Sequence, residues 1–162
     1  MKSEIYWIDK SLAVIARPRG GDWLEDEVKS LSNAGLNVIV SLLKDDEEIE
    51  LNLTQERTEC EAAGLDFYSL PINDRSVPAS IDEVYNFVSE LATLIIRDDK
   101  KIGIHCRQGL GRSPLIAAAL LVRMGHTSDE AFQKISLARG VEVPETIEQK
   151  EWLDKFAFKF GS

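Results

Sequence analysis

The sequence predicts an α/β domain in which helices cover both faces of a central sheet. Short apolar, β-rich runs alternate with helix-like segments early in the chain, and helices dominate its last third. The length of 162 residues fits one domain of ordinary size. Because no internal repeat, low-complexity segment or linker interrupts this order, we expect residues 1–162 to form a single domain.

Five strands are expected, because five runs combine apolar and β-branched residues between polar or glycine-bearing segments. In chain order they cover residues 5–8, 12–16, 37–43, 65–72 and 101–106.

Glycines and capping residues mark the expected helices. The first begins around Gly21 and runs to about residue 34, with Gly35 as its C-cap. The acidic residues 44–50 form a polar connection or a short helix. Ser80 and Glu83 have capping-box spacing, which predicts a helix starting at residue 81. The later helices are expected over residues 54–63, 81–97, 112–124, 128–138 and 145–158.

The composition is that of a soluble globular protein, with 44% apolar and 29% charged residues. The longest apolar run, residues 115–122, is too short to span a bilayer. The first residues lack the basic-then-apolar layout of a secretion signal. We therefore expect a cytoplasmic protein without membrane insertion.

The charge and the cysteine content argue against two further classes of function, nucleic-acid binding and metal binding. Nineteen basic and 28 acidic residues give a net charge of −9, which argues against non-specific nucleic-acid binding. A local cationic pocket for a small anion remains compatible with an acidic surface. Neither Cys60 nor Cys106 belongs to a metal-type pair, and His105 and His126 lie too far apart for a helical metal clip. No metal or other cofactor is expected.

The segment HCRQGLGRSP, residues 105–114, has the layout of an anion-binding loop between a strand and a helix. Free backbone N–H groups and the helix dipole favour negative charge at a helix start. Gly109 and Gly111 allow the backbone to curl around a ligand, and Pro114 fits the first helical turn. Arg112 adds a planar set of donors suited to phosphate oxygens.

Cys106 lies at the mouth of this loop, where the same groups stabilise a thiolate. The predicted result is a nucleophile aimed at a bound oxyanion. Ser113 is placed to donate a hydrogen bond to the sulfur, which would help it leave a phospho-enzyme intermediate. The alternative is a buried structural cysteine in a β-turn-α connection.

HCRQGLGRS resembles the signature loop of the cysteine-dependent protein tyrosine phosphatase superfamily. The resemblance extends over residues 37–153, and the segment PINDRSVP, residues 71–78, is similar in particular to the acid loop of the kinase-associated phosphatase-like branch of the dual-specificity phosphatases. It implies a three-layer domain with a mixed, mostly parallel central sheet, and a two-step reaction through a phosphocysteine. In the substrate-binding loop it implies contacts to phosphate from Arg107, Gln108, Gly109, Leu110 and Gly111.

Asp74 is the candidate general acid, because it follows an apolar strand in the loop LPINDRSVP, residues 70–78. The alcohol or phenol oxygen of a phosphate ester is a poor leaving group unless a general acid protonates it. PINDRSVP is similar to the acid loop of the dual-specificity phosphatases, which implies the same role. Arg75 is expected near the pocket. The alternative for Asp74 is a hydrogen bond within its own turn.

Two further positions match the family by resemblance alone. His105 matches the signature histidine, which implies a role in tuning the thiolate and ordering the loop. Gln149, in VPETIEQKEWL, matches a glutamine near the catalytic water. A structural histidine and a surface glutamine are the respective alternatives.

Some interpretations remain open from the residues. Residues 17–21 form either a basic patch that touches substrate or only a loop. Cys60 is a buried apolar residue or, less favoured, a redox partner of Cys106. Because Arg107 makes a more anionic ligand conceivable, a phosphoinositide or inositol phosphate substrate ranks second to a phosphorylated protein or peptide. A catalytically weak phospho-binding module ranks third.

Overall fold

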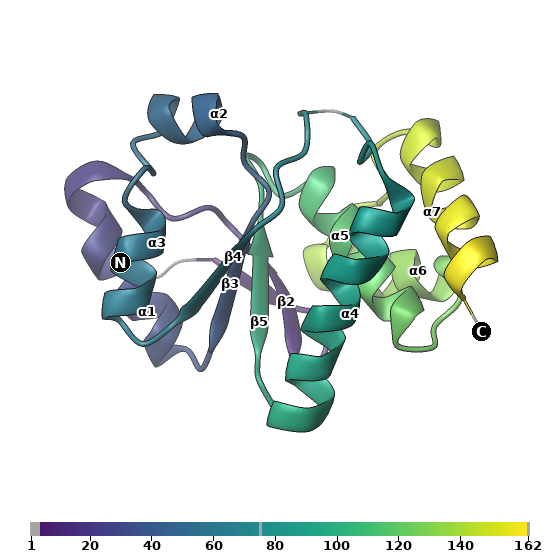
Figure 1. Ribbon diagram of the computed structural model, residues 1–162, viewed down its shortest axis with the longest axis horizontal. Coiled ribbons are helices and arrows are strands. Elements are labelled where there is room, and N and C mark those ends of the chain that lie inside the picture. The colour runs from purple at the N-terminus through teal and green to yellow at the C-terminus, as the bar shows by residue number, and fades with distance from the viewer. Residues whose placement is uncertain (1–3, 75, 162) are drawn as a thin grey trace.

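The computed structural model describes residues 4–74 and 76–161 of the chain. All five predicted strands are present, and each is shorter than its apolar run; β3 and β4 have four residues each where seven and eight were expected (Figure 1). They are β1 (Ile5–Trp7), β2 (Leu12–Ile15), β3 (Val38–Ser41), β4 (Asp66–Ser69) and β5 (Ile102–His105).

The strands form one mixed sheet in the order β1-β2-β5-β3-β4. The β1 strand pairs antiparallel with β2, and every other neighbour is parallel. In the centre, Ile104 of β5 aligns with Val14 of β2 on one side and with Val40 of β3 on the other. The predicted fold class is therefore confirmed. Because β2, β3, β4 and β5 run the same way, their carboxyl ends meet at one edge of the sheet, where ligands bind in such folds.

The helices agree with the predicted segments, with boundaries that differ by up to three residues. The chain at Gly21–Trp23 forms a 3₁₀ turn before the α-helix begins. The last helix starts later than expected because Thr146 caps it, forming a capping box with Gln149. The α-helices are α1 (Leu24–Asn33), α2 (Asp45–Glu50), α3 (Glu56–Ala62), α4 (Ile81–Asp98), α5 (Arg112–Arg123), α6 (Ser128–Arg139) and α7 (Ile147–Phe160).

The sheet separates two apolar cores, which makes the domain three-layered. Alternate residues of β2 enter opposite cores: Leu12 and Val14 face one, and Ala13 and Ile15 face the other. Figure 1 shows α1 and α3 on one side of the sheet and α4, α5 and α6 on the other, with α7 outermost. Within the described residues no helix is long and apolar enough to cross a membrane.

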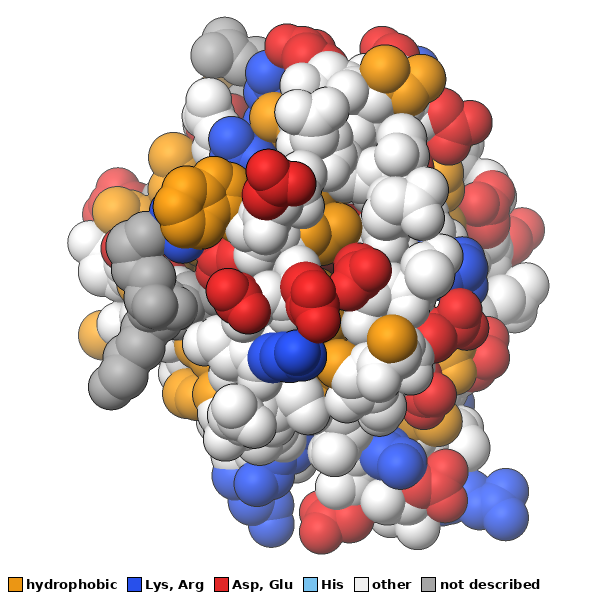
Figure 2. Space-filling view, turned by 90° about the vertical axis from the view of Figure 1, so that its left-hand side faces the viewer, with side chains coloured by type: hydrophobic (Ala, Val, Ile, Leu, Met, Phe, Trp, Pro, Cys, Tyr) orange, Lys and Arg blue, Asp and Glu red, His pale blue; other side chains and the backbone are white. Residues whose placement is uncertain are grey.

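The surface carries the acidic charge that the composition indicates. Figure 2 faces the left-hand side of Figure 1, where α1 and α3 lie, and shows several Asp and Glu side chains close together. The short helix α2, which follows β3 at the carboxyl edge of the sheet, has the sequence DDEEIE. One of its acids, Glu47, is buried.

Candidate active site

The loop between β5 and α5 forms the centre of the site. The strand β5 ends at His105, and α5 begins at Arg112 with every residue up to Val122 buried. This helix lacks a polar face because α4, α6, α7 and the sheet surround it. Gly109 adopts a φ of +75°, a conformation that a residue with a side chain rarely takes. The loop is thus fixed between two buried elements.

Cys106 is buried, with 3% of its surface exposed. The backbone N–H of Gly109 donates a hydrogen bond to Cys106 Sγ at 3.2 Å. Ser113 Oγ lies 3.3 Å from the same sulfur. An N–H and a hydroxyl directed at sulfur are the groups that stabilise a thiolate and a sulfur leaving group. The geometry therefore favours a reactive cysteine over a merely structural one.

Two arginines bind carbonyl groups on the outside of this loop. Arg17 donates from Nη1 to the carbonyl of Arg107. Arg139, the last residue of α6, donates from Nε to the carbonyl of Gly109 at 3.1 Å and stacks on the Tyr6 ring at 4.1 Å. The peptide unit of Gly109 is held with its carbonyl outward. Sequence reasoning missed Arg139, since nothing local connects it to the loop.

Arg112 is fixed by a bidentate ion pair with Glu47. Its Nη1 and Nη2 lie 2.7 and 2.9 Å from the two carboxylate oxygens. Burial lowers the pKa of the Arg112 guanidinium, but hydrogen bonding to Glu47 and Coulombic attraction to the neighbouring acidic groups together raise it by more, so this pKa lies above its ordinary value. Burial raises the pKa of the Glu47 carboxyl, but hydrogen bonds from Arg112 and the Lys44 backbone, together with the charges of Arg112 and Arg107, bring it below its ordinary value. Sequence reasoning did not find Glu47.

The acid loop reaches the same guanidinium. Arg112 Nη1 donates to the carbonyl of Ile72 at 2.8 Å, and Nη2 lies 3.2 Å from Asp74 Oδ1. The Asp74 side chain is 56% exposed, as required of a group that must meet a substrate. Arg75 lies outside the described residues. A small pocket holds the predicted nucleophile, arginine and acid together, and it is lined by Asp74, Cys106, Gln108, Leu110, Gly111, Arg112 and Glu145.

The guanidinium of Arg107 points to the acids of α2. Its Nη2 lies 2.9 Å from Glu50 Oε1, and its Nη1 lies 4.0 Å from Glu47 Oε2. Hydrogen bonding to Glu50 raises the pKa of Arg107. Arg107 is absent from the lining of the pocket, whereas its neighbour Gln108 is part of it.

His105 is buried behind the nucleophile, where its Nε2 lies 2.5 Å from Glu56 Oε2. Its Nδ1 lies 3.3 Å from the carbonyl oxygen of Cys106. The second carboxylate oxygen of Glu56 is buried without a hydrogen-bond partner among the described residues. His105 is thus anchored to α3 and fixes the strand end that carries Cys106. Glu56 was not expected from the sequence.

Gln149 is buried rather than a surface residue of its helix. Its Oε1 accepts from the backbone N–H groups of Glu145 and Thr146, at 3.1 and 3.3 Å. Its Nε2 has no hydrogen-bond partner among the described residues and would lie 3.1 Å from a Cβ at Gly111. The amide is therefore directed at the signature loop, next to the pocket.

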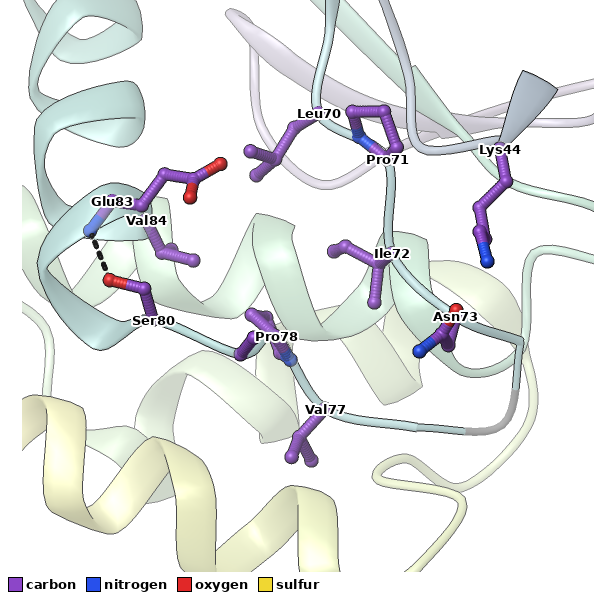
Figure 3. Close-up of a pocket in the computed structure, with 11 residues that line it drawn as sticks. Lys44, Leu70, Pro71, Ile72, Asn73, Val77, Pro78, Ser80, Glu83 and Val84 are labelled. Atoms are coloured by element: carbon purple, nitrogen blue, oxygen red, sulfur yellow. Dashed lines mark hydrogen bonds between the residues drawn. The ribbon is translucent and has the colours of Figure 1, made fainter.

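A separate cavity of about 140 Å³ lies beside the acid loop (Figure 3). Figure 3 shows the acid-loop residues Leu70, Ile72 and Asn73 along one side, and Ser80 accepting from the N–H of Glu83 at the start of α4 on the other. This cavity adjoins the loop that carries Asp74, so the loop borders unfilled space on that side. The Ile72 residue ties the loop to the site, because its N–H donates to the carbonyl of Leu42 at 3.1 Å and its carbonyl accepts from Arg112 at 2.8 Å.

The described residues contain no cluster of three or more His, Cys, Asp or Glu side chains arranged to hold a metal ion. The residues assembled around Cys106 instead comprise a sulfur, a guanidinium, a carboxylic acid and backbone donors. Together they can bind an oxyanion, attack it and protonate a leaving group.

Comparison with known proteins identifies the family of the chain. Residues 13–126 match the family model described as "Polymorphic toxin system, DSP-PTPase phosphatase". Cyclin-dependent kinase inhibitor 3 of Rattus norvegicus is 34% identical over 94 residues. That alignment covers 57% of this chain and 43% of the rat protein, so the match spans less than half of this relative.

Solved structures extend the likeness to nearly the whole chain. The crystal structure of kinase associated phosphatase, with its catalytic cysteine replaced by serine, superposes with a TM-score of 0.86 at 23% identity. It covers 99% of this chain and 97% of that one. The active form of Tk-PTP gives a TM-score of 0.80 at 28% identity and covers 96% and 97% of the two chains.

Proposed function

The chain belongs to the cysteine-dependent dual-specificity protein tyrosine phosphatases, and from this premise we propose that it hydrolyses phosphomonoesters on proteins. The observation that carries the proposal is the single pocket that holds Cys106, Arg112 and Asp74. The substrate class is a phosphorylated protein or peptide, with phosphotyrosine first and phosphoserine or phosphothreonine next. The reaction proceeds through a phosphocysteine.

In the first step the Cys106 thiolate attacks phosphorus, and the bond from phosphorus to the ester oxygen breaks. Arg112 and the backbone N–H groups of the loop bind the equatorial oxygens, where negative charge is concentrated in the transition state. Asp74 donates its proton to the leaving oxygen. This role is supported by the position of Asp74 in the same pocket as Cys106, with its Oδ1 3.2 Å from the guanidinium proposed to bind phosphate.

In the second step water attacks the phosphocysteine, and Asp74, now ionised, accepts the proton of that water. Sulfur leaves as a thiolate, stabilised by Ser113 Oγ and the Gly109 N–H, both within hydrogen-bonding distance of Sγ. Gln149, whose buried Nε2 is free to donate among the described residues, is proposed to orient the water. His105 supports the loop through Glu56.

We also propose that residues 1–162 form one catalytic domain, since both apolar cores pack on the same sheet. A cytoplasmic location stays a prediction from the sequence. The phosphoinositide alternative has weaker support than a peptide substrate, because the guanidinium of Arg107 is engaged by Glu50. The alternative of a weak binding module is opposed by the presence of nucleophile, arginine and acid in one pocket.

The test is phosphate release from a substrate panel, with Cys106→Ser as the blank. The panel contains phosphotyrosine, phosphoserine and phosphothreonine peptides and mono- to tris-phosphorylated phosphoinositides. We expect peptide turnover that Cys106→Ser abolishes. Turnover of lipids alone would replace the peptide proposal with the alternative, and phosphopeptide binding without turnover would indicate a binding module.

A further inference from the structure

Glu145 contributes a second carboxylate to the pocket that Asp74 also lines. It comes from the segment between α6 and α7, whereas Asp74 comes from the segment between β4 and α4. Its backbone N–H is bound by Gln149, and its side-chain Oε1 would lie 3.6 Å from a Cβ at Gly111. Among the described residues, no ion pair or hydrogen bond of the Glu145 carboxylate is found. The Glu145 carboxylate is therefore available to interact with a ligand that enters the pocket.

Asp74 lies 3.2 Å from Arg112 Nη2, whereas the Glu145 carboxylate has no ion-pair partner among the described residues. Arg112 is paired with Glu47 at 2.7 and 2.9 Å, and Arg107 is turned away to Glu50 at 2.9 Å. One phosphoryl group still binds, because the backbone donors and Arg112 converge on it. Arg112 is the one cation among the described residues that line this pocket, so a second anionic group beside the phosphoryl group would meet the carboxylates of Glu145 and Asp74.

We infer that Glu145 is a specificity-determining residue, which selects phosphomonoesters whose neighbouring groups are uncharged or cationic. For this chain the favoured substrate is a phosphopeptide with basic or neutral flanks, and the disfavoured ones are acidic peptides and multiply phosphorylated lipids. This inference rests on the proposed phosphatase function, and it specifies which charge is preferred beside the phosphoryl group of the substrate. The acidic helix α2 on the other side of the loop acts in the same direction.

The experiment compares two phosphotyrosine peptides that differ only in their flanks, lysine on both sides or glutamate on both sides. The quantity of interest is the ratio of kcat/KM for the two peptides, measured in each variant. In the wild type we expect the lysine peptide to be preferred. In Glu145→Gln, which keeps the side-chain shape, that preference should fall about fivefold, as expected for two unit charges about 8 Å apart in partly screened surroundings.

Glu142→Gln is the matched control, because Glu142 lies on the same connection and lines a different groove. Glu142→Gln changes the net charge by the same amount as Glu145→Gln, so its ratio of kcat/KM for the two peptides should equal that of the wild type. The effect of Glu145 should shrink in high salt, where exposed charges are screened. An unchanged ratio in Glu145→Gln, or an equal change in Glu142→Gln, would overturn the inference.

Binding separates this inference from the proposed function. The same two peptides are titrated against Cys106→Ser and against Cys106→Ser combined with Glu145→Gln. If the wild type hydrolyses neither peptide, the proposed function fails, yet the ratio of the two Kd values still tests Glu145. A lysine preference in Kd that disappears with Glu145→Gln supports the inference, and equal ratios in both proteins refute it.

Discussion

Replacing Glu47 with glutamine should weaken both the fold and the catalysis, because Glu47 is the buried partner of the predicted phosphate-binding arginine. The Arg112 side chain is 1% exposed and that of Glu47 is 10% exposed, so water cannot replace the lost ion pair. Glutamine keeps one acceptor oxygen but presents an N–H₂ group to the guanidinium. One of the two charge-assisted hydrogen bonds, at 2.7 and 2.9 Å, is therefore lost.

The expected loss in the free energy of unfolding is about 2 kcal/mol. Complete loss of a partner from a buried pair costs about 3–5 kcal/mol. Arg112 keeps the carbonyl of Ile72 at 2.8 Å and Asp74 at 3.2 Å, which places Glu47→Gln below that range. A freer guanidinium also binds the transition state less well, so kcat/KM should fall about tenfold or more.

The effect should depend on pH. The pKa of Glu47 is lowered in the folded protein, so its ionised form stabilises the fold at every pH above the unfolded pKa. This contribution is lost as the pH falls through the folded pKa, which lies below about 4.5. The difference in stability between wild type and Glu47→Gln should therefore be full at pH 7 and shrink in acid.

Urea unfolding followed by tryptophan fluorescence, at pH 7 and at decreasing pH, measures this difference. Glu50→Gln is the control, because the Glu50–Arg107 pair is exposed and should leave the free energy of unfolding unchanged within error. Equal midpoints for the wild type and Glu47→Gln at pH 7 would refute the reasoning. So would a difference that grows in acid.

Three further predictions concern the loop and its neighbours. Asp74→Asn should reduce kcat/KM on phosphotyrosine about 100-fold and much less on an activated aryl phosphate, whose leaving group needs no proton; equal losses on both would remove Asp74 as the acid. Arg139→Ala frees the carbonyl of Gly109, now bound at 3.1 Å, and should raise the inhibition constant of orthovanadate about fivefold; an unchanged constant would show that the loop holds its shape without Arg139. Burial raises the pKa of the Cys60 thiol to about 12, so iodoacetamide at pH 8 should alkylate Cys106 first in mass spectra; modification of Cys60 in the folded protein would contradict its buried position.

The secondary structure was predictable because its signals are local. The five apolar runs became the five strands, and Ser80 caps α4 by accepting from the N–H of Glu83. The start of α7 was placed too early, because Thr146 and Gln149 form a capping box that the interpretation of the sequence did not use. Gln149 proved buried, which the sequence of an exposed-looking helix does not reveal.

The partners of the site were not predictable in the same way. The helix α2 has several acids in succession, and only the fold selects Glu47 for burial against Arg112, 65 residues further on. Glu56 meets His105 across 49 residues, and Arg139 reaches Gly109 across 30. Such pairs depend on which strands are neighbours in the sheet, and a single sequence carries no signal for that.

The strand–loop–helix unit around Cys106 was predictable from the sequence, because the predicted nucleophile, the glycines, Ser113 and Arg112 lie within one short segment whose geometry is local. The sequence also indicated the acid loop with Asp74. The tertiary structure decided which charges remain free. It pairs Arg107 with Glu50 and Arg112 with Glu47, and it places Glu145 at the pocket. The physical reason is that charge pairing depends on distance in space, and the order β1-β2-β5-β3-β4 sets those distances.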